Sequence, residues 1–356
     1  MYKILLICLL IPMIGNANPH PKKGKYEKSK TINKEFNVNA DALLKINNKY
    51  GNVDVVSWNE NRVVIDVKIT VSGNNEDKVM SRLEQINVHF EGSSSLVSAK
   101  TVIEKSSSNW FGSNNNMNYQ IDYKVKMPTT NDANLVNDYG TISLNELKGK
   151  ADINCDYGKI LIGSLYHDDN SINIDYTSNS VIEFMKSGNI NADYSKLRVE
   201  KAKSIDLNAD YTTTVFENIE NLDFNCDYGK IEVENGNVII GNGDYLTMRF
   251  GTIYKKIRID SDYGGIRINK LMKDFDSVYI NSDYTGIKIG LDSNAAFNFI
   301  AKMSYGGFSY DGDNINYIKK VVKSSSKYYE GYVNKENSGS KIEISSDYGS
   351  VKLFNN

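Results

Sequence analysis

A single short motif recurs along most of this chain at an almost constant spacing. The motif is Asp-Tyr-Gly or a close variant, and from Tyr139 to Tyr305 its successive tyrosines are 18, 19, 18, 17, 17, 17, 18, 21 and 21 residues apart. A fixed period of this length is typical of a protein built from stacked structural repeats. The repeat tyrosines are Tyr50, Tyr139, Tyr157, Tyr176, Tyr194, Tyr211, Tyr228, Tyr245, Tyr263, Tyr284, Tyr305 and Tyr348.

Each repeat has the pattern of two short strands that meet at a corner. Apolar residues stand four and six positions before the tyrosine, and three and five after it, as in Leu222, Phe224, Ile231 and Val233 around Tyr228. Such alternation is typical of strands, and the Gly, Thr or Ser directly after most of the tyrosines marks a corner. About 18 residues cannot hold a crossover helix or close a sandwich. We therefore predict an all-β fold, a single-stranded β-solenoid whose coils stack at roughly 4.8 Å.

Two further observations bear on this prediction. No proline follows Pro128, as interior coils require, because proline cannot donate to a strand ladder. A left-handed helix of hexapeptide repeats would also give 18 residues per coil, but the sequence has no six-residue sub-period. The regular repeats are predicted to cover residues 131–309.

The two ends of the stack are predicted to carry caps that protect it from edge pairing. Residues 35–130 form the first cap, which is β-rich and contains one short helix. The helix is expected from Asn75 to Ile86, because Val79, Leu83 and Ile86 share one face. The predicted strands of this cap cover residues 62–71, 96–103 and 119–127, with a polar loop at 106–118. Residues 310–356 form the second cap, a hairpin that covers the stack, followed by a last coil at Tyr348.

The first residues predict export. Lys3 precedes an apolar run of eleven residues, Ile4 to Ile14, which suits a signal peptide and is too short to span a bilayer. The small residues Gly15 and Ala17 place the cleavage after Ala17, so residues 1–17 are the predicted signal peptide. Residues 18–34 contain six lysines and are predicted to be a basic flexible linker. After removal of the signal peptide we expect an extracytoplasmic protein, periplasmic, surface-exposed or secreted. No later apolar run could span a membrane, so we expect the mature chain to be soluble or peripherally attached.

Neither composition nor motifs indicate an enzyme. The formal charge of −2 gives no reason to expect a nucleic-acid partner. His89 and His167 stand in a strand and a turn, outside any nucleophile motif, and no phosphate-binding loop is present. Cys155 and Cys226 share one register four coils apart, about 19 Å at the strand spacing. A disulfide needs Cα atoms within roughly 7 Å, so both thiols are predicted to be unpaired.

The candidate site is a column of aspartates, each directly before a repeat tyrosine. Its members are Asp138, Asp156, Asp175, Asp193, Asp210, Asp227, Asp244, Asp262, Asp283 and Asp347. If they point outward, they could bind Ca²⁺ or face a glycan. We favour a structural role, in which each carboxylate accepts a backbone N–H beyond the tyrosine of its own corner. The tyrosines themselves are expected to pack inward. If they were exposed instead, their rings could stack on sugars.

The whole pattern resembles a known family. Lys49-Tyr50-Gly51-Asn52-Val53 followed by Trp58, the strand–helix–strand insert and the later Asp-Tyr-Gly coils are similar to the bacterial "putative adhesin" family with β-strand repeats. This is an exported family of unknown function, and the resemblance covers nearly all of residues 36–356. It implies the architecture and no site residues.

These observations lead to one functional hypothesis and two alternatives. We expect an exported, non-enzymatic, adhesin-like scaffold for interactions at the envelope or cell surface, with a glycan or an envelope protein as its partner. The alternatives are a glycan-active β-helix enzyme that uses the aspartate face, and a periplasmic structural or regulatory accessory protein. No cofactor is expected, apart from the Ca²⁺ considered for the aspartates.

Overall fold

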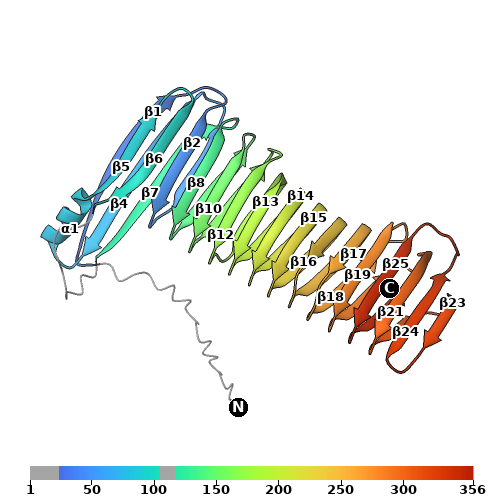
Figure 1. Cartoon of the computed structure of the whole chain (residues 1–356). Helices are drawn as coiled ribbons and strands as arrows, with labels where there is room; N and C mark the ends of the chain where they lie inside the picture. The colour runs from blue at the N-terminus through green and yellow to red at the C-terminus, as the bar shows by residue number, and fades with distance from the viewer. Residues whose placement is uncertain (1–23, 105–116, 356) are drawn as a thin grey trace, which may run out of the picture.

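The computed structural model describes residues 24–104 and 117–355. The predicted signal peptide, the start of the predicted linker and most of the polar loop at 106–118 therefore lie outside the described residues. The described chain is a long stack of strands with one helix, α1 (Glu76–Glu84), at its amino-terminal end (Figure 1). This confirms the predicted all-β solenoid.

Each coil contributes one strand to each of two faces, and the repeat tyrosine stands at the corner between them. Face one contains the strands that run into the tyrosine, and face two contains those that leave it. Neighbouring coils pair in parallel, as when Asn208 of one coil pairs with Asn225 of the next. Between Tyr176 and Tyr263 the chain passes from face two to face one of the next coil within one long strand.

The strands of face one are β2 (Leu43–Lys49), β8 (Asp132–Asp138), β10 (Ala151–Asp156), β12 (Asn170–Asp175), β19 (Ser277–Asp283), β21 (Phe297–Ser304) and β25 (Lys341–Asp347). The strands of face two are β3 (Val53–Trp58), β9 (Thr141–Leu147), β11 (Lys159–Leu165), β18 (Gly265–Leu271), β20 (Gly286–Leu291), β22 (Gly307–Asp311) and β26 (Ser350–Asn355). The long strands shared by both faces are β13 (Ser180–Asp193), β14 (Lys196–Asp210), β15 (Thr213–Asp227), β16 (Lys230–Asn242) and β17 (Thr247–Asp260).

The core lies between the two faces and is built from columns of stacked side chains. The apolar positions predicted from the alternation, such as Leu222, Phe224, Ile231 and Val233, are buried. A small residue in one coil makes room for a large one in the next: a Cβ on Gly241 would lie 2.3 Å from the ring of Phe224, which already fills that space. In the described coils, continuous columns of apolar side chains fill the space between the two faces, so we expect a binding surface on the outside of the solenoid.

The amino-terminal cap extends both faces of the stack. β7 (Asn118–Pro128), β4 (Arg62–Gly73) and β1 (Tyr26–Asn37) continue face two beyond β3, whereas β6 (Leu96–Ile103) and β5 (Ile86–Gly92) continue face one beyond β2. The side chain of Asn75 caps α1 by accepting the N–H of Lys78 at 3.0 Å. Val79 and Leu83 are buried as predicted, whereas Ile86 is buried as the first residue of β5.

The predicted basic linker is wrong from Tyr26 onward, where the chain forms β1. The apolar side chains Tyr26, Ile32 and Phe36 pack against the core. Lys28 between them is half-buried and pairs with Glu76 of α1 at 2.7 Å. A lysine can cover apolar surface with its aliphatic stem while its ammonium stays in water. The lysine-rich composition therefore concealed an edge strand.

The carboxyl-terminal end has an order that differs from the chain order. The predicted hairpin is present as β23 (Ile315–Val322) and β24 (Ser326–Val333), and it extends face one through β21. The last coil does not end the stack. Its strands β25 and β26 lie between the coils of Tyr284 and Tyr305, pairing with β19 and β20 on one side and with β21 and β22 on the other (Figure 1).

This insertion predicts the effect of a truncation. A chain that ends at Gly339 lacks β25 and β26, through which β21 and β22 pair with the rest of the stack. We expect residues 292–339 to become sensitive to limited proteolysis while the coils from Tyr50 to Tyr245 keep their protection. Unchanged resistance of residues 292–339 would contradict the inserted position of the last coil.

Candidate functional site: a ridge of stacked tyrosines

The twelve repeat tyrosines form one continuous ladder along the corner of the solenoid. Eleven successive ring pairs have centroids 4.8–5.2 Å apart and planes within 10° of parallel. We call this ladder the tyrosine ridge, and its length is about 55 Å at these spacings. In spatial order its members are Tyr50, Tyr139, Tyr157, Tyr176, Tyr194, Tyr211, Tyr228, Tyr245, Tyr263, Tyr284, Tyr348 and Tyr305.

The prediction that the tyrosines pack inward is wrong. Their side chains are 37–64% exposed. The cause is the backbone at the corner, where every one of them has a φ of +49° to +63°. This left-handed residue adds one position to the alternation, so the aspartate and the tyrosine both point outward. The residue that follows points inward, and it is a Gly, Thr or Ser at every corner except that of Tyr245, where it is Leu246. The sequence contained this signal. The apolar residues stand at even distances before the tyrosine, four and six, but at odd distances after it, three and five, so the alternation shifts by one residue at the corner.

The left-handed backbone makes the choice of tyrosine informative. Glycine, asparagine and aspartate occupy this region at low cost, whereas a bulky residue there is an outlier. A large aromatic ring at twelve such positions therefore needs a compensating interaction. Stacking supplies one, since an aromatic pair contributes about 0.5–1.5 kcal/mol beyond the area it buries.

The stacking limits what the ridge can bind. Each interior ring has both faces covered by its neighbours, so a sugar cannot lie on a ring face there. At one end, Tyr119 closes the ladder edge-on against Tyr50, with centroids 4.9 Å apart. The ridge presents ring edges and phenol hydroxyls instead. No described residue hydrogen-bonds to the hydroxyls of the ridge from Tyr139 to Tyr305, so each can still donate and accept.

The ten predicted aspartates form an acidic row along the face-one side of the ridge, and all are at least partly exposed. Their hydrogen bonds differ from the predicted ones. The Oδ1 of Asp193 accepts the backbone N–H of Asp210 in the next coil at 3.0 Å, and Asp210 accepts that of Asp227 at 3.0 Å. The same bond recurs at 2.7–2.9 Å through Asp227, Asp244, Asp262 and Asp283. These carboxylates therefore join successive coils rather than capping their own corner.

Asp156 is a member of the row that lacks such a bond. Burial, followed by the charges of Asp175 and Asp138, raises the pKa of Asp156. No described residue hydrogen-bonds to the Asp156 carboxylate. At the amino-terminal end, Lys49 takes the place of an aspartate and pairs with Asp138 at 2.8 Å. Burial and the crowding of like charges thus both disfavour the ionised form of Asp156.

The face-two side of the ridge has the opposite charge. Eight lysines and arginines stand two or four residues after a ridge tyrosine, against two acidic residues, Asp54 and Glu232. Glu232 is itself paired with Lys230 and lies 3.8 Å from Arg249. We call these eight the basic row: Lys159, Lys196, Arg198, Lys230, Arg249, Arg267, Lys288 and Lys352. The ridge therefore separates an acidic flank from a basic one.

Polar side chains inside the corner satisfy the turning backbone. Where Thr or Ser follows the tyrosine, its hydroxyl takes this role: Thr212 Oγ1 donates to the carbonyl of Asp210 at 2.9 Å and accepts the N–H of Ser195 at 3.0 Å. Where Gly follows Tyr50 and Tyr139, an asparagine two before the tyrosine replaces it: Asn48 donates to the carbonyl of Ile121 at 2.9 Å, and Asn137 donates to that of Gly51 at 2.8 Å. These groups face inward and hold the corner.

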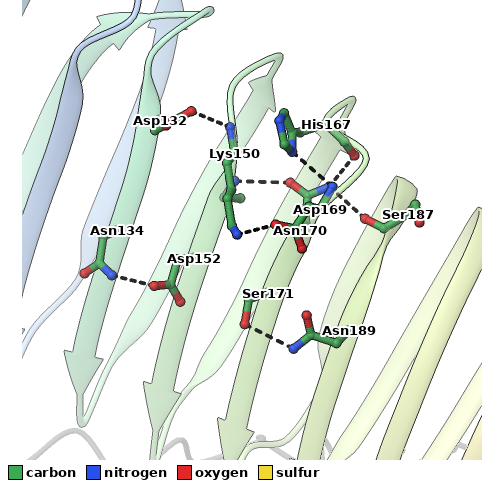
Figure 2. Close-up of polar contacts among 11 residues, drawn as sticks. Asp132, Asn134, Lys150, Asp152, His167, Asp169, Asn170, Ser171, Ser187 and Asn189 are labelled. Carbon is green, nitrogen blue, oxygen red and sulfur yellow. Dashed lines mark hydrogen bonds and ion pairs between the residues drawn. The ribbon is translucent and has the colours of Figure 1, made fainter.

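The structure does not assemble a metal or catalytic centre from the predicted candidates. Within residues 24–104 and 117–355, no group of three or more His, Cys, Asp or Glu side chains could hold a metal ion. His89 is exposed on β5, 3.3 Å from Glu91. His167 lies in the predicted turn, where its Nδ1 accepts the N–H of Asp169 at 3.0 Å (Figure 2).

Figure 2 shows that the polar residues around His167 hold a turn together. Asn170 is fully buried and donates to the carbonyls of His167 at 2.7 Å and Ser187 at 3.0 Å, while accepting the N–H of Ala151 at 3.1 Å. Lys150 pairs with Asp169 across the turn. Two contacts of His167, that of its ring with the N–H of Asp169 and that of its carbonyl with Asn170, stabilise the turn.

The two cysteines are free and buried, as predicted. Burial raises the pKa of each thiol to about 12. We expect the folded mature protein to leave both thiols unreactive toward a thiol reagent at neutral pH, and the denatured, unreduced protein to titrate two per chain. A count of zero after denaturation of a monomer would show that Cys155 and Cys226 pair, and that the register is wrong.

Comparisons with known proteins found likenesses to solved structures. No family model and no curated protein matches the chain. Among solved structures, it is similar to a "putative adhesin" from Parabacteroides merdae (10% identity, 93% of this chain and 98% of that one, TM-score 0.37). It is also similar to one from Parabacteroides distasonis (9%, 91% and 97%, 0.34) and to a "putative cell adhesion protein" from Clostridium sporogenes (12%, 93% and 100%, 0.20). TM-scores this low carry no argument about function.

Among the described residues, no helix is long and apolar enough to span a bilayer.

Proposed function

We propose that this protein is an exported, non-catalytic interaction scaffold of the adhesin type, which makes its contacts at the envelope or cell surface through the tyrosine ridge. The observation that carries the proposal is the ridge itself. Twelve tyrosines are held in a costly backbone conformation, and each residue remains 37–64% exposed. An uninterrupted amphipathic stripe of this length is unusual on a monomeric protein, and large exposed patches commonly mark interaction sites.

Stacking between neighbouring rings explains why the residues of the ridge are aromatic, but it does not explain why they carry hydroxyls. An apolar ladder of phenylalanines would stack equally well, whereas tyrosine adds a hydroxyl at each rung. These hydroxyls have no partner in the described chain from Tyr139 to Tyr305. Tyrosine is enriched at interfaces because it combines a large apolar body with a polar end. The composition of the ridge therefore supports contact with a partner.

The arrangement of the acidic row supports a non-catalytic role. A glycan-cleaving site needs two carboxylates in different environments, so that one is an acid and the other a base or nucleophile. Here the aspartates repeat from coil to coil, and each of five accepts the backbone N–H of the equivalent aspartate in the next coil. A repeated structural bond explains these five aspartates without a substrate.

Exposure and role can be tested together in the organism that makes the protein. We expect brief protease treatment of intact cells to remove the protein, and deletion of its gene to reduce attachment of the cells to one another or to a surface. A protein that is protected in intact cells and released only by lysis would favour the periplasmic accessory role. Release of reducing ends from envelope glycans by the purified protein would instead identify an enzyme.

A further inference from the structure

We propose that the partner of the tyrosine ridge is a second copy of this chain, docked ridge to ridge with the two solenoids parallel. The inference rests on the proposed role of the ridge as the contact surface. It is carried by three properties of the ridge: its area, its repeat and its unlike flanks.

The exposed area of the ridge is large enough for a stable dimer. A tyrosine side chain can bury about 150–250 Å², and the ridge side chains are 37–64% exposed. Twelve of them present on the order of 1,000 Å² per copy, whereas a standard interface buries about 800 Å² per partner. The rings are already fixed by stacking on their neighbours, so little side-chain entropy is lost when they dock.

The repeat of the ridge matches itself. A partner that contacts every rung must present groups at the same 4.8–5.2 Å spacing. A second ridge meets this condition at every rung. Its hydroxyls are also self-complementary, because a phenol both donates and accepts a hydrogen bond. Burial and the neighbouring rings and aspartates raise the pKa of Tyr194, Tyr228 and Tyr263, which keeps these phenols neutral at physiological pH.

The two flanks select the orientation. A two-fold axis along the solenoid brings the acidic row of each copy opposite the basic row of the other. A two-fold axis across the solenoid would instead set acidic row against acidic row, with ten aspartates on each side. Like charges across an interface are unfavourable, so complementarity favours the parallel dimer. In that dimer each rung faces the same rung of its partner, and both amino termini lie at the same end.

Sedimentation velocity of the purified mature protein tests the association. We expect a dimer, and we expect the triple variant Tyr194→Asn, Tyr211→Asn, Tyr228→Asn to raise its dissociation constant at least tenfold. Asparagine tolerates the left-handed backbone, so the variant should keep the circular dichroism spectrum of the parent. The matched control replaces three tyrosines off the ridge that are similarly exposed, Tyr166, Tyr254 and Tyr317, and should leave the dimer unchanged.

A charge exchange at one rung tests the orientation. Beside Tyr157, Asp156 belongs to the acidic row and Lys159 to the basic row. In the parallel dimer, Lys159→Glu alone and Asp156→Lys alone each create like-charge contacts and weaken association. An equimolar mixture of the two variants should restore it as a heterodimer, because both contacts become attractive. An antiparallel dimer would show no such rescue, since these residues would face distant rungs.

The outcomes separate the dimer from the proposed function. A monomeric wild-type protein, a dimer unaffected by the ridge variant, or the lack of rescue on mixing would each overturn the parallel dimer. Binding of an envelope polysaccharide to a monomer through the ridge would also overturn it, yet would leave the scaffold function intact. Cell attachment that persists with the triple ridge variant would contradict the proposed function itself.

Discussion

Replacing Tyr211 by valine should lower the free energy of unfolding by about 2–4 kcal/mol. The change removes two stacked ring pairs, with Tyr194 and Tyr228, whose centroids lie 4.9 and 5.0 Å away. It also puts a β-branched residue at a φ of +53°, which such residues avoid. Thermal unfolding, together with hydrogen exchange in the neighbouring coils, measures the loss.

The control for this prediction is Tyr211→Gly at the same corner. Glycine loses the same two ring pairs but adopts the left-handed backbone without strain, so the two effects oppose each other. We expect the glycine variant to lie within roughly 1 kcal/mol of the parent protein. If valine and glycine were equally destabilising, the corner backbone would contribute nothing, and the argument that the rings compensate for strain would fail.

Replacing Asp210 by alanine should cost about 1.5–3 kcal/mol, the usual contribution of a hydrogen bond to a charged group. Its carboxylate accepts the N–H of Asp227 in the next coil, and its own N–H donates to Asp193. Alanine removes the acceptor, whereas Asp210→Asn keeps one and should be milder. A chelator should leave the melting temperature unchanged, because the bond needs no metal.

Asp156 is the matched control for Asp210, because its carboxylate lies in the same row without such a bond. Its raised pKa means that the charged form is less stable in the folded chain than in the unfolded one. The stability it contributes therefore falls as the pH rises through its folded pKa. Asp156→Asn should leave stability unchanged or raise it at neutral pH. A loss of unfolding free energy as large as that of Asp210→Ala would show that like-charge crowding at Asp156 is unimportant. If a chelator lowered the melting temperature and Ca²⁺ restored it, the acidic row would be a metal site.

Periodicity predicted most of the architecture, because the two determinants of a solenoid are local. Alternation defines the strands, and the spacing of the tyrosines defines the coil. The register of the cysteines followed from the same spacing. The helix of the amino-terminal cap was also predictable, since Val79 and Leu83 repeat at helical spacing behind the cap residue Asn75.

What the sequence concealed depends on contacts between distant segments. The last coil enters between those of Tyr284 and Tyr305 because β25 pairs with both β19 and β21, and no local pattern encodes that choice. Counting in twos through the corner placed the tyrosines inside, whereas the left-handed residue shifts the count by one. The sequence places the acidic row directly before the tyrosines, but the backbone N–H that each of five carboxylates accepts lies one coil away, beyond the reach of any local motif.

The most direct test of the account measures attachment by cells that carry the triple ridge variant Tyr194→Asn, Tyr211→Asn, Tyr228→Asn. Cells with equal surface amounts of the parent protein and of the off-ridge variant with Tyr166, Tyr254 and Tyr317 replaced by asparagine serve as the references. We expect attachment to be lost with the ridge variant and kept with the off-ridge variant. Equal attachment by all three would contradict the claim that the protein acts through its tyrosine ridge.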